Sequence, residues 1–359
     1  MKHAYVAILA GGIGSRFWPA SREETPKQFL DILGTGQSLL KSTFDRFNKI
    51  VPFSNIYILT NERYRELVKQ QLPKLKDYQI ICEPMRRNTA PCIAYFAFKM
   101  QCLDPEAQLI IAPSDHLVLK PKSFRKTIKT AVRYTAGNDD LVMLGIRPSR
   151  PDTGYGYIQY LDDSEEGGTY QVKTFTEKPD LPLAKTFLKS GDFLWNSGIF
   201  IWTVKTIISA FEKHLPEIYD AFSKGLNLYN GDKEKGFIKK AYSTCPNISI
   251  DYGLMEKADN VRVIPASFGW SDLGTWSSLY EHYDKDYYSN AVSGKRVMIY
   301  NATNCMIMAQ DQKLMVLQGL DNYIVVDTKD VLLICEKTEE NQIKAIADDI
   351  KSKKLKKYL

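Results

Sequence analysis

Glycines and basic residues near the start of the chain form the segment best suited to chemistry. Gly11, Gly12 and Gly14 follow a short apolar run, and Arg16 and Lys27 stand close behind them. Glycines let the backbone turn sharply and bring its N–H groups close to an anion, and the two cations add charge that suits phosphate. The spacing matches neither the dinucleotide motif nor the Walker loop. We therefore expect a phosphate-binding loop of another kind; the alternative is an ordinary turn flanked by solvated charges.

Two aspartates stand where a divalent metal could bind. Asp115 follows the apolar run 109–112, after a proline and a serine, and Asp272 lies in a loop rich in glycine and tryptophan. Mg²⁺ is usually held by one or two carboxylates together with phosphate oxygens. Taken singly, each aspartate is more often a turn former or a helix cap. None of the cysteines or histidines has the spacing of a zinc site.

The segment 9–19, closed by Pro26-Lys27, resembles the N-terminal signature of the sugar-phosphate nucleotidylyltransferase family, whose members make nucleotide sugars and release diphosphate. Ser15 stands where many members have threonine. The resemblance implies that this loop holds a nucleoside triphosphate and that Arg16 and Lys27 are catalytic. It implies further nucleotide contacts from Leu9, Ala10, Gly11, Gly12, Gly14, Ser15, Ser114 and Asp115.

Metal binding follows from the same resemblance. The strings that contain Asp115 and Asp272 are similar to the two metal-binding signatures of the family, which implies that both carboxylates hold Mg²⁺. The acceptor would be a phosphate monoester, which is already ionised at neutral pH because its second pKa is about 6. A general base is therefore unnecessary, and catalysis would rest on positioning and on neutralising phosphate charge.

Further motifs resemble the bacterial mannose-1-phosphate guanylyltransferase branch of this family. Segment 83–91 reads Glu-Pro-Met-Arg-Arg-Asn-Thr-Ala-Pro, and similar strings occur at 145–148, 153–158, 177–179, 195–200 and 249–253. Asn88 and Thr89 open a predicted helix, so polar side chains and free N–H groups converge there; the alternative is a helix cap with nothing bound. The resemblance implies nucleotide contact by both residues. For the sugar phosphate it implies contacts from Gly154, Tyr155, Glu177, Lys178, Asn196 and Asp251.

These resemblances together imply a reaction. The branch joins GTP and α-D-mannose 1-phosphate into GDP-mannose and diphosphate, by Mg²⁺-assisted in-line attack of the sugar phosphate on the α-phosphate. Two alternatives stay open: a nucleotidylyltransferase with another base or sugar, and a non-catalytic relative that binds a nucleotide sugar and regulates a partner. Some members continue into a phosphomannose isomerase domain, for which 359 residues leave too little room. We therefore expect transferase activity alone.

The elements that must position these residues alternate along the first half of the chain. Short apolar runs, each bounded by turn residues, lie at 5–9, 55–59, 79–82, 109–112 and 141–144. Helical patterns lie between them at 39–49, 62–71, 89–102 and 123–135. Such alternation is typical of a doubly wound α/β fold, here a Rossmann-like mixed sheet. Ligands in such sheets lie beyond the carboxyl ends of the strands, where the glycines and Asp115 fall.

The sequence pattern changes twice in the rest of the chain. Hairpin-like segments are expected at 155–161 and 170–177. From about residue 290, very short strands follow at 297–300, 306–308, 314–317, 323–326 and 331–335, which predicts a small β-roll or β-helix. A terminal helix has one apolar stripe, formed by Ile343, Ile346, Ala347 and Ile350. We expect a catalytic domain at 1–288 and a C-terminal unit at 289–359, whose stripe packs either on its own unit or on a second copy in a homodimer.

Composition narrows the class of protein. The formal net charge is +6, with 44% hydrophobic and 25% charged residues, as in ordinary globular proteins. Lysines and arginines are spread along the chain, which argues against nucleic acid as a partner. No apolar run is long enough to span a membrane, and the first residues lack a signal-peptide cleavage site. The six cysteines lie far apart and are expected to be buried free thiols, so we expect a cytoplasmic location.

Overall fold

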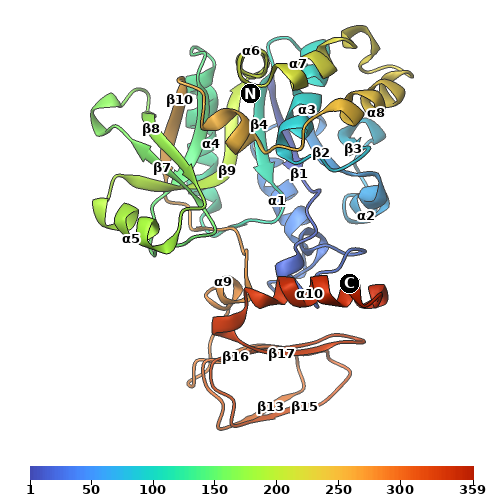
Figure 1. Ribbon diagram of the computed structural model, residues 1–359, viewed down its shortest axis with the longest axis vertical. Coiled ribbons are helices and arrows are strands. Elements are labelled where there is room, and N and C mark those ends of the chain that lie inside the picture. The colour runs from blue at the N-terminus through green and yellow to red at the C-terminus, as the bar shows by residue number, and fades with distance from the viewer. The chain divides into compact units, whose positions relative to one another are not determined.

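The computed structural model describes residues 1–359 throughout, and its contacts divide the chain into two compact units (Figure 1). The first unit comprises Met1–Gly11, Phe44–Ser114 and Val118–Trp270. The second unit comprises Gly12–Thr43, Asp115–Leu117 and Ser271–Leu359. The boundary expected between residues 288 and 289 lies inside the second unit, and a functional division at that point stays a prediction.

A nine-stranded sheet forms the centre of the first unit, in the order β3-β2-β1-β4-β9-β6-β10-β8-β7. Its strands are β1 (Ala4–Leu9), β2 (Ile56–Asn61), β3 (Ile80–Glu83), β4 (Gln108–Pro113), β6 (Leu141–Ile146), β7 (Gly156–Tyr160), β8 (Tyr170–Glu177), β9 (Phe193–Thr203) and β10 (Val261–Ala266). β1 is parallel to β2 and β4, β2 to β3, and β6 to β10, whereas β9 runs antiparallel to β4, β6 and β7. The predicted Rossmann-like mixed sheet is confirmed, and the five predicted apolar runs correspond to β1, β2, β3, β4 and β6.

Helices surround this sheet and differ in how deeply they are buried. They are α2 (Arg65–Gln71), α3 (Thr89–Leu103), α4 (Pro121–Thr135), α5 (Leu181–Ser190), α6 (Val204–His214), α7 (Pro216–Ser223) and α8 (Glu234–Thr244), while α1 (Leu39–Phe47) begins in the second unit and ends in the first. Every residue of α3 from Ala90 to Met100 is buried, as expected for a helix enclosed within a core. It packs against α6 and α7, where Phe98 stacks on Phe222 with ring centroids 6.3 Å apart. The first turn of α3, which begins at Thr89, is therefore anchored in the core by the buried residues that follow Thr89.

The second unit combines short strands with two helices. They are β12 (Ala291–Ser293), β13 (Val297–Tyr300), β14 (Met306–Met308), β15 (Met315–Gln318), β16 (Tyr323–Asp327), β17 (Leu332–Glu336), α9 (Trp276–Tyr280) and α10 (Gln342–Ser352). β14 is parallel to β12 and β16, β17 is antiparallel to β16, and β13 pairs in parallel with β15. The two-residue strands β5 (Leu117–Val118) and β11 (Trp270–Ser271) fall where the chain passes from one unit to the other.

One core within the second unit joins residues from both ends of the sequence. Phe17 and Trp18 are buried in the same cluster as Trp276 and Ile343. The rings of Phe17 and Trp276 have centroids 5.0 Å apart, and the Trp18 indole N–H donates to the carbonyl of Tyr358 at 2.7 Å. The segment that follows the N-terminal glycines is thus packed together with the C-terminal helix.

The apolar stripe of α10 packs on its own unit, which was one of the two expected alternatives (Figure 1). Ile343 and Ala347 are buried in the core, and Ile350 packs against it. Ile346, which was expected to be part of the stripe, is 37% exposed and lies at the edge of this helix face.

Two expectations from composition can be compared with the structure directly. None of the helices combines the length and the apolarity that a membrane-spanning helix requires. All six cysteines are free thiols, as predicted, but the expected burial holds only for Cys92, Cys245 and Cys305; Cys82 and Cys335 are half-buried, and Cys102 is exposed. Burial raises the pKa of the Cys245 thiol to about 11, so this side chain stays protonated at neutral pH.

Candidate active site

Residues that follow β1 and β4 lie together at the carboxyl edge of the sheet in the first unit. The backbone N–H of Ala10 donates to the carbonyl of Leu59 at 2.7 Å, and that of Ser114 donates to the carbonyl of Leu9 at 3.1 Å. Parallel strands present such residues at the edge where doubly wound sheets bind their ligands. The structure therefore brings together Leu9, Ala10, Gly11 and Ser114 of the predicted nucleotide set. The other members of that set, Gly12, Gly14, Ser15 and Asp115, belong to the second unit.

Gly14 is the position in the glycine loop, residues 11–14, that requires a glycine. Its φ is 67°, and a Cβ atom there would lie 2.7 Å from the Cβ of Lys27. At Gly12, in contrast, no atom lies within 4 Å of such a Cβ. The side-chain amide of Gln28 donates to the carbonyl of Gly12 at 2.9 Å. The segment around Lys27 thus closes the loop, as its sequence position predicts.

The two predicted catalytic cations differ in their surroundings. Arg16 is exposed, and its guanidinium makes neither a hydrogen bond nor an ion pair. Lys27 is only 4% exposed, and its Nζ donates to Asp115 Oδ2 at 2.8 Å, to the Leu273 carbonyl at 2.9 Å and to the Asp272 carbonyl at 3.0 Å. A lysine ammonium has three donors, so these acceptors use all of them. Arg16 is free to meet a phosphate, whereas Lys27 is engaged with protein oxygens.

The loop that carries Asp272 has an uncommon backbone conformation. Leu273 has a φ of 46°, a left-handed value that residues other than glycine rarely adopt. Its side chain is fully buried, and its N–H donates to the Ser271 hydroxyl at 3.2 Å. The N–H of Gly274 donates to Asp272 Oδ1 at 2.9 Å, and a side chain at Gly274 would collide with that carboxylate. These contacts hold the Asp272 carboxylate in the loop and direct two carbonyls toward Lys27.

Asp115 and Asp272 fit a magnesium ion better than a zinc ion. Burial opposes ionisation of Asp115, but the charges of Lys27 and His116 hold the pKa of its carboxyl below the usual value. The loops of both aspartates contact the same ammonium, so the predicted pair lies in one part of the second unit. No group of three or more His, Cys, Asp or Glu side chains is placed to hold a metal. A carboxylate pair suits Mg²⁺, which keeps substrate oxygens among its ligands, and does not suit a closed zinc site.

Polar residues on β8 and β9 form a second cluster, within the first unit. The side-chain amide of Asn196 donates to Asp251 Oδ1 at 2.7 Å. Glu177 forms an ion pair with Lys178, whose backbone N–H donates to the carbonyl of Tyr155 at 3.2 Å. The structure thus brings together five of the residues predicted for the sugar phosphate, and the sixth, Gly154, precedes Tyr155 in the chain.

The electrostatics of this cluster are set by two neighbouring carboxyls. Burial, and after it the charge of Glu177, raises the pKa of Asp251 to about 6. Gly156 leaves the space that this arrangement needs, because a Cβ there would collide with the Glu177 carboxylate and lie 3.4 Å from the Cβ of Asn196. Carboxylates and an amide pair well with hydroxyl groups, and the Lys178 ammonium suits a phosphate.

Arg150 is a candidate substrate contact that the sequence analysis missed. Its guanidinium lies 5.3 Å from the centre of the Trp195 ring and pairs with Asp152 Oδ2 at 2.6 Å. The Tyr155 ring lies edge-on to Trp195 at 5.0 Å and to Trp270 at 5.3 Å. The signal in the sequence was an arginine between two of the family strings. The contact of its guanidinium with the Trp195 ring of β9 could not be read from spacing.

The residues predicted to contact the base, Asn88 and Thr89, both have protein partners. Asn88 has a φ of 65°, and its side-chain carbonyl accepts from the N–H of Thr89 at 3.0 Å. The Thr89 hydroxyl oxygen accepts from the N–H of Ile250 at 2.9 Å. The helix-cap alternative therefore describes Asn88, which caps α3. Contact of either residue with a nucleotide stays a prediction.

Glu83 was not singled out from the sequence, although it ends β3 beside Gly11. A Cβ on Gly11 would lie 3.6 Å from Glu83 Oε2. The Tyr242 hydroxyl donates to Glu83 Oε1 at 3.0 Å, and burial raises the pKa of the carboxyl to about 7. A carboxylate in this place can accept hydrogen bonds from the N–H groups of a base. The signal that could have found it was an acidic residue at the carboxyl end of a buried strand.

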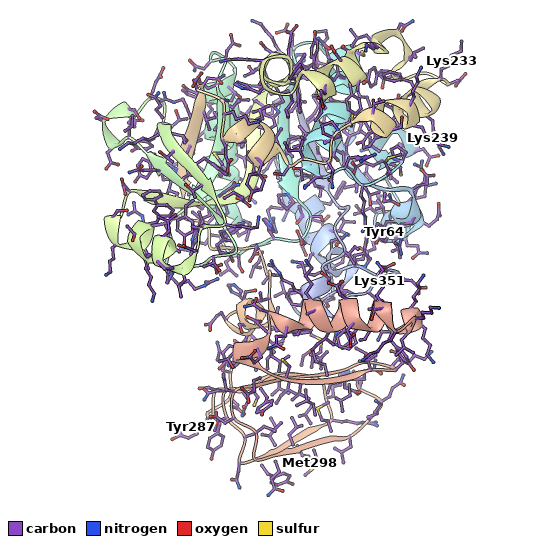
Figure 2. The ribbon with its side chains drawn as sticks, in the orientation of Figure 1. Tyr64, Lys233, Lys239, Tyr287, Met298 and Lys351 are labelled. Atoms are coloured by element: carbon purple, nitrogen blue, oxygen red, sulfur yellow. The ribbon has the colours of Figure 1, made fainter.

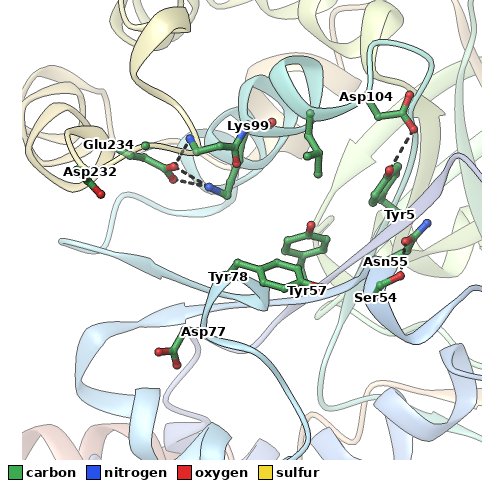
Figure 3. Close-up of a pocket in the computed structure, with 13 residues that line it drawn as sticks. Tyr5, Ser54, Asn55, Tyr57, Asp77, Tyr78, Lys99, Asp104, Asp232 and Glu234 are labelled. Carbon is green, nitrogen blue, oxygen red and sulfur yellow. Dashed lines mark hydrogen bonds and ion pairs between the residues drawn. The ribbon is translucent and has the colours of Figure 1, made fainter.

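A hollow of about 1030 Å³ elsewhere in the first unit contains none of these residues (Figure 3). Tyr5, Tyr57 and Tyr78 line it together with Lys99 and Glu234, which form an ion pair at 2.6 Å. Tyr5 and Tyr57 lie at the starts of β1 and β2, and Tyr78 precedes β3. The hollow is therefore at the amino edge of the sheet, opposite the edge where the predicted nucleotide residues of this unit lie.

Comparisons with known proteins identify the family of this chain. A family model described as nucleotidyl transferase matches residues 5–288. Mannose-1-phosphate guanylyltransferase of Salmonella montevideo is 39% identical over 96% of this chain and 73% of its own length, and that of Klebsiella pneumoniae is 36% identical over 98% and 74%. A solved structure described as mannose-1-phosphate geranyltransferase from Thermus thermophilus has a TM-score of 0.87 and 29% identity, over 97% of this chain and 99% of that one. The chain belongs to the nucleotidyl transferase family.

Proposed function

We propose that this chain transfers GMP from GTP to α-D-mannose 1-phosphate, giving GDP-mannose and diphosphate. The observation that carries the proposal is the similarity to proteins named mannose-1-phosphate guanylyltransferase, at 39% and 36% identity over 96% and 98% of this chain. The cluster of Glu177, Asn196 and Asp251 supports the sugar half of the reaction, because such groups pair with hydroxyls.

The reaction gives each group a definite part. A phosphate oxygen of the sugar phosphate attacks the α-phosphorus of GTP, the bond from that phosphorus to the bridging oxygen breaks, and diphosphate leaves with the electron pair. No protein base is needed, since the attacking phosphate has a second pKa of about 6. Arg16 stabilises the charge on the departing diphosphate. Lys178 binds the acceptor phosphate, and Glu177, Asn196 and Asp251 orient the sugar.

Asp115 and Asp272 are the residues that would hold Mg²⁺. When bound, the ion supplies charge neutralisation and orientation at the phosphate oxygens. The glycine loop places backbone N–H groups and Arg16 near the triphosphate. Glu83, with Asn88 and Thr89, is the proposed site of base selection.

An assay of diphosphate release tests this function. The purified chain is incubated with Mg²⁺, GTP and mannose 1-phosphate, and then with each substrate replaced singly by another nucleoside triphosphate or hexose 1-phosphate. We expect release that needs Mg²⁺ and is at least tenfold faster with GTP and mannose 1-phosphate than with any other pair. Faster release with another pair would assign a different nucleotidylyltransferase, and no release with any pair would favour the non-catalytic alternative.

We also infer that the C-terminal unit, whose parallel strands fit a short β-roll or β-helix, supports a homodimer. Met298, Tyr300, Leu314 and Val316 are between 45% and 62% exposed on or next to the paired strands β13 and β15. Figure 2 shows Met298 pointing outward from these strands. An exposed apolar patch of this kind is typical of protein interfaces. The six free cysteines fit the reducing conditions of the cytoplasm, which stays our expected location.

A further inference from the structure

The ammonium of Lys27 is enclosed on several sides by groups that attract a cation. Its three donors meet one carboxylate oxygen, of Asp115, and two carbonyl oxygens, of Asp272 and Leu273, at 2.8 to 3.0 Å. The face of the Phe17 ring lies 5.3 Å from Nζ and adds a favourable cation–π contact. The buried position of Lys27 Nζ, with three oxygen acceptors and an aromatic ring around it, therefore favours a positive charge.

The backbone conformation of the loop that carries Asp272 and Leu273 directs their carbonyl oxygens toward Lys27. Leu273 keeps a left-handed φ of 46°, and its carbonyl is one of the oxygens that face Lys27. Such conformations persist where surrounding contacts require them. The buried side chain of Leu273 and the hydrogen bond from Gly274 to the Asp272 carboxylate supply those contacts. Oxygen atoms of the kind that Mg²⁺ prefers are thus gathered around an ammonium.

We propose that Lys27 is the resident cation of this site in the metal-free protein and that a divalent metal ion displaces it. The inference rests on the proposed metal site at Asp115 and Asp272. A divalent ion bound by the Asp115 carboxylate would repel an ammonium held by the same group. Lys27 would then leave its three acceptors and become available to the substrate phosphates. Binding of the metal ion would in this way release the Lys27 ammonium, which stabilises the metal-free site, to bind the substrate phosphates.

The exchange has a measurable consequence for metal affinity. In the wild type, a metal ion that binds without nucleotide must break the contacts of Lys27, so its affinity is lowered by competition. In Lys27→Met the Asp115 carboxylate has no competing cation. We expect the dissociation constant of Mn²⁺, measured by electron paramagnetic resonance without nucleotide, to fall at least tenfold in Lys27→Met. The melting temperature of this variant should be lower than that of the wild type without metal and should rise with added Mn²⁺.

Two further variants identify the source of the effect. Lys99→Met removes another buried ammonium, which is 8% exposed and pairs with Glu234, and it should leave Mn²⁺ affinity unchanged. Asp115→Asn combined with Lys27→Met should abolish the gain in affinity. An unchanged or weaker Mn²⁺ affinity in folded Lys27→Met would overturn the proposal, since it would mean that Lys27 only supports the loops.

A second measurement uses the wild-type protein and does not depend on the folding of a variant. Amine-reactive labelling followed by peptide mass spectrometry reports how accessible each lysine is. We expect labelling of Lys27 to be slow without metal, because the side chain is buried and engaged, and to increase at least threefold at saturating Mg²⁺. Lys99 serves as the internal control and should not change. Equal labelling of Lys27 with and without Mg²⁺ would rule out the displacement.

The failure of this inference can be told apart from the failure of the proposed function. Diphosphate release by the wild type is measured on the same preparation. In one outcome, diphosphate release requires Mg²⁺, but Mg²⁺ leaves the labelling of Lys27 unchanged and Lys27→Met binds Mn²⁺ no more tightly than the wild type. In that case the displacement is wrong and the proposed function stands. If Mn²⁺ affinity rises in Lys27→Met while no substrate pair releases diphosphate, the displacement stands and the function is wrong.

Discussion

The side chain of Lys27 leaves no space for a Cβ atom on residue 14. We predict that Gly14→Ala lowers the free energy of unfolding by about 3 kcal/mol, because alanine disfavours a positive φ and its Cβ would lie 2.7 Å from the Cβ of Lys27. Urea unfolding followed by tryptophan fluorescence measures the change. Gly12→Ala is the matched control, since nothing lies within 4 Å of its Cβ. Equal stability of the two variants would show that the loop adjusts its backbone.

The carboxyl of Asp251 makes stability depend on pH. Its pKa is about 6 in the folded protein and about 3.9 in an unfolded chain, so the folded state binds the proton more tightly. The protonated carboxyl therefore makes its whole contribution to the free energy of unfolding below about pH 4. This contribution is lost as the pH rises through about 6. The difference between the two pKa values corresponds to about 3 kcal/mol.

Replacing the Asp251 carboxyl by an amide should remove this dependence of stability on pH. We predict that Asp251→Asn raises the free energy of unfolding at pH 7.5 by about 2 kcal/mol and has little effect at pH 4, because asparagine cannot ionise and still accepts from Asn196. Urea unfolding at both pH values measures this. Asp232→Asn, at an exposed position, should change neither value. A stabilisation that is the same at both pH values would contradict the assigned cause.

The motifs in the sequence single out candidate residues but not the partners that these residues meet in the fold. The glycine loop, Asp115, Asp272 and the sugar-phosphate residues were recognisable as motifs along the chain. The engagement of Lys27 by Asp272 and Leu273 was not, because it joins positions some 245 residues apart. Glu83 was missed for a similar reason, since its position beside Gly11 arises from the order of strands in the sheet.

At the scale of elements, β9 is the longest strand that escaped prediction. The apolar runs that became β1, β2, β3, β4 and β6 are continuous, as in buried parallel strands. β9 instead contains Asn196, Ser197 and Gly198, which interrupt any regular pattern. It forms because β4, β6 and β7 pair with it, and such tertiary pairing is invisible in local propensity. The same interruption supplies the site with Asn196.

The exposed face of β13 and β15 provides a prediction at this scale. If this face joins two copies, Val316→Asp should weaken dimerisation at least tenfold, because it would bury an unpaired charge in the interface. Val316 is 55% exposed, so the fold of each copy should be unaffected. Sedimentation velocity over a range of concentrations measures the shift. Leu332→Asp on β17, where the leucine is 58% exposed, is the matched control. A monomeric wild type would remove the homodimer from our proposal.

At the scale of the whole molecule, neither unit is a continuous stretch of sequence. The chain passes between the units after Gly11, Thr43, Ser114, Leu117 and Trp270, and the crossings after Gly11, Ser114 and Trp270 lie in predicted site motifs. A boundary at 288/289 follows from the change in strand pattern, which the sequence displays. The association of Gly12–Thr43 with Ser271–Leu359 depends on packing between distant segments, which periodicity does not report.

This packing predicts that the C-terminal helix supports the segment around the glycine loop. Ala347 is 8% exposed in the core that also contains Phe17 and Trp18. We predict that Ala347→Asp destabilises the protein by about 3 kcal/mol, since it buries an unpaired charge. It should also slow diphosphate release at 37 °C. Ile346→Asp, at the neighbouring position that is 37% exposed, should be close to neutral in both measurements. Normal stability of Ala347→Asp would show that α10 contributes little to the shared core.

The shared core also sets an order of events during synthesis. A chain leaves the ribosome from its N-terminus at roughly 5 to 20 residues per second. Gly12–Thr43 therefore emerges well before Ser271–Leu359, whose residues complete its core. Until then Phe17 and Trp18 lack their final partners, and such exposed apolar side chains are what chaperones recognise in nascent proteins. Gly12–Thr43 is thus synthesised early but is among the last segments to reach its folded state.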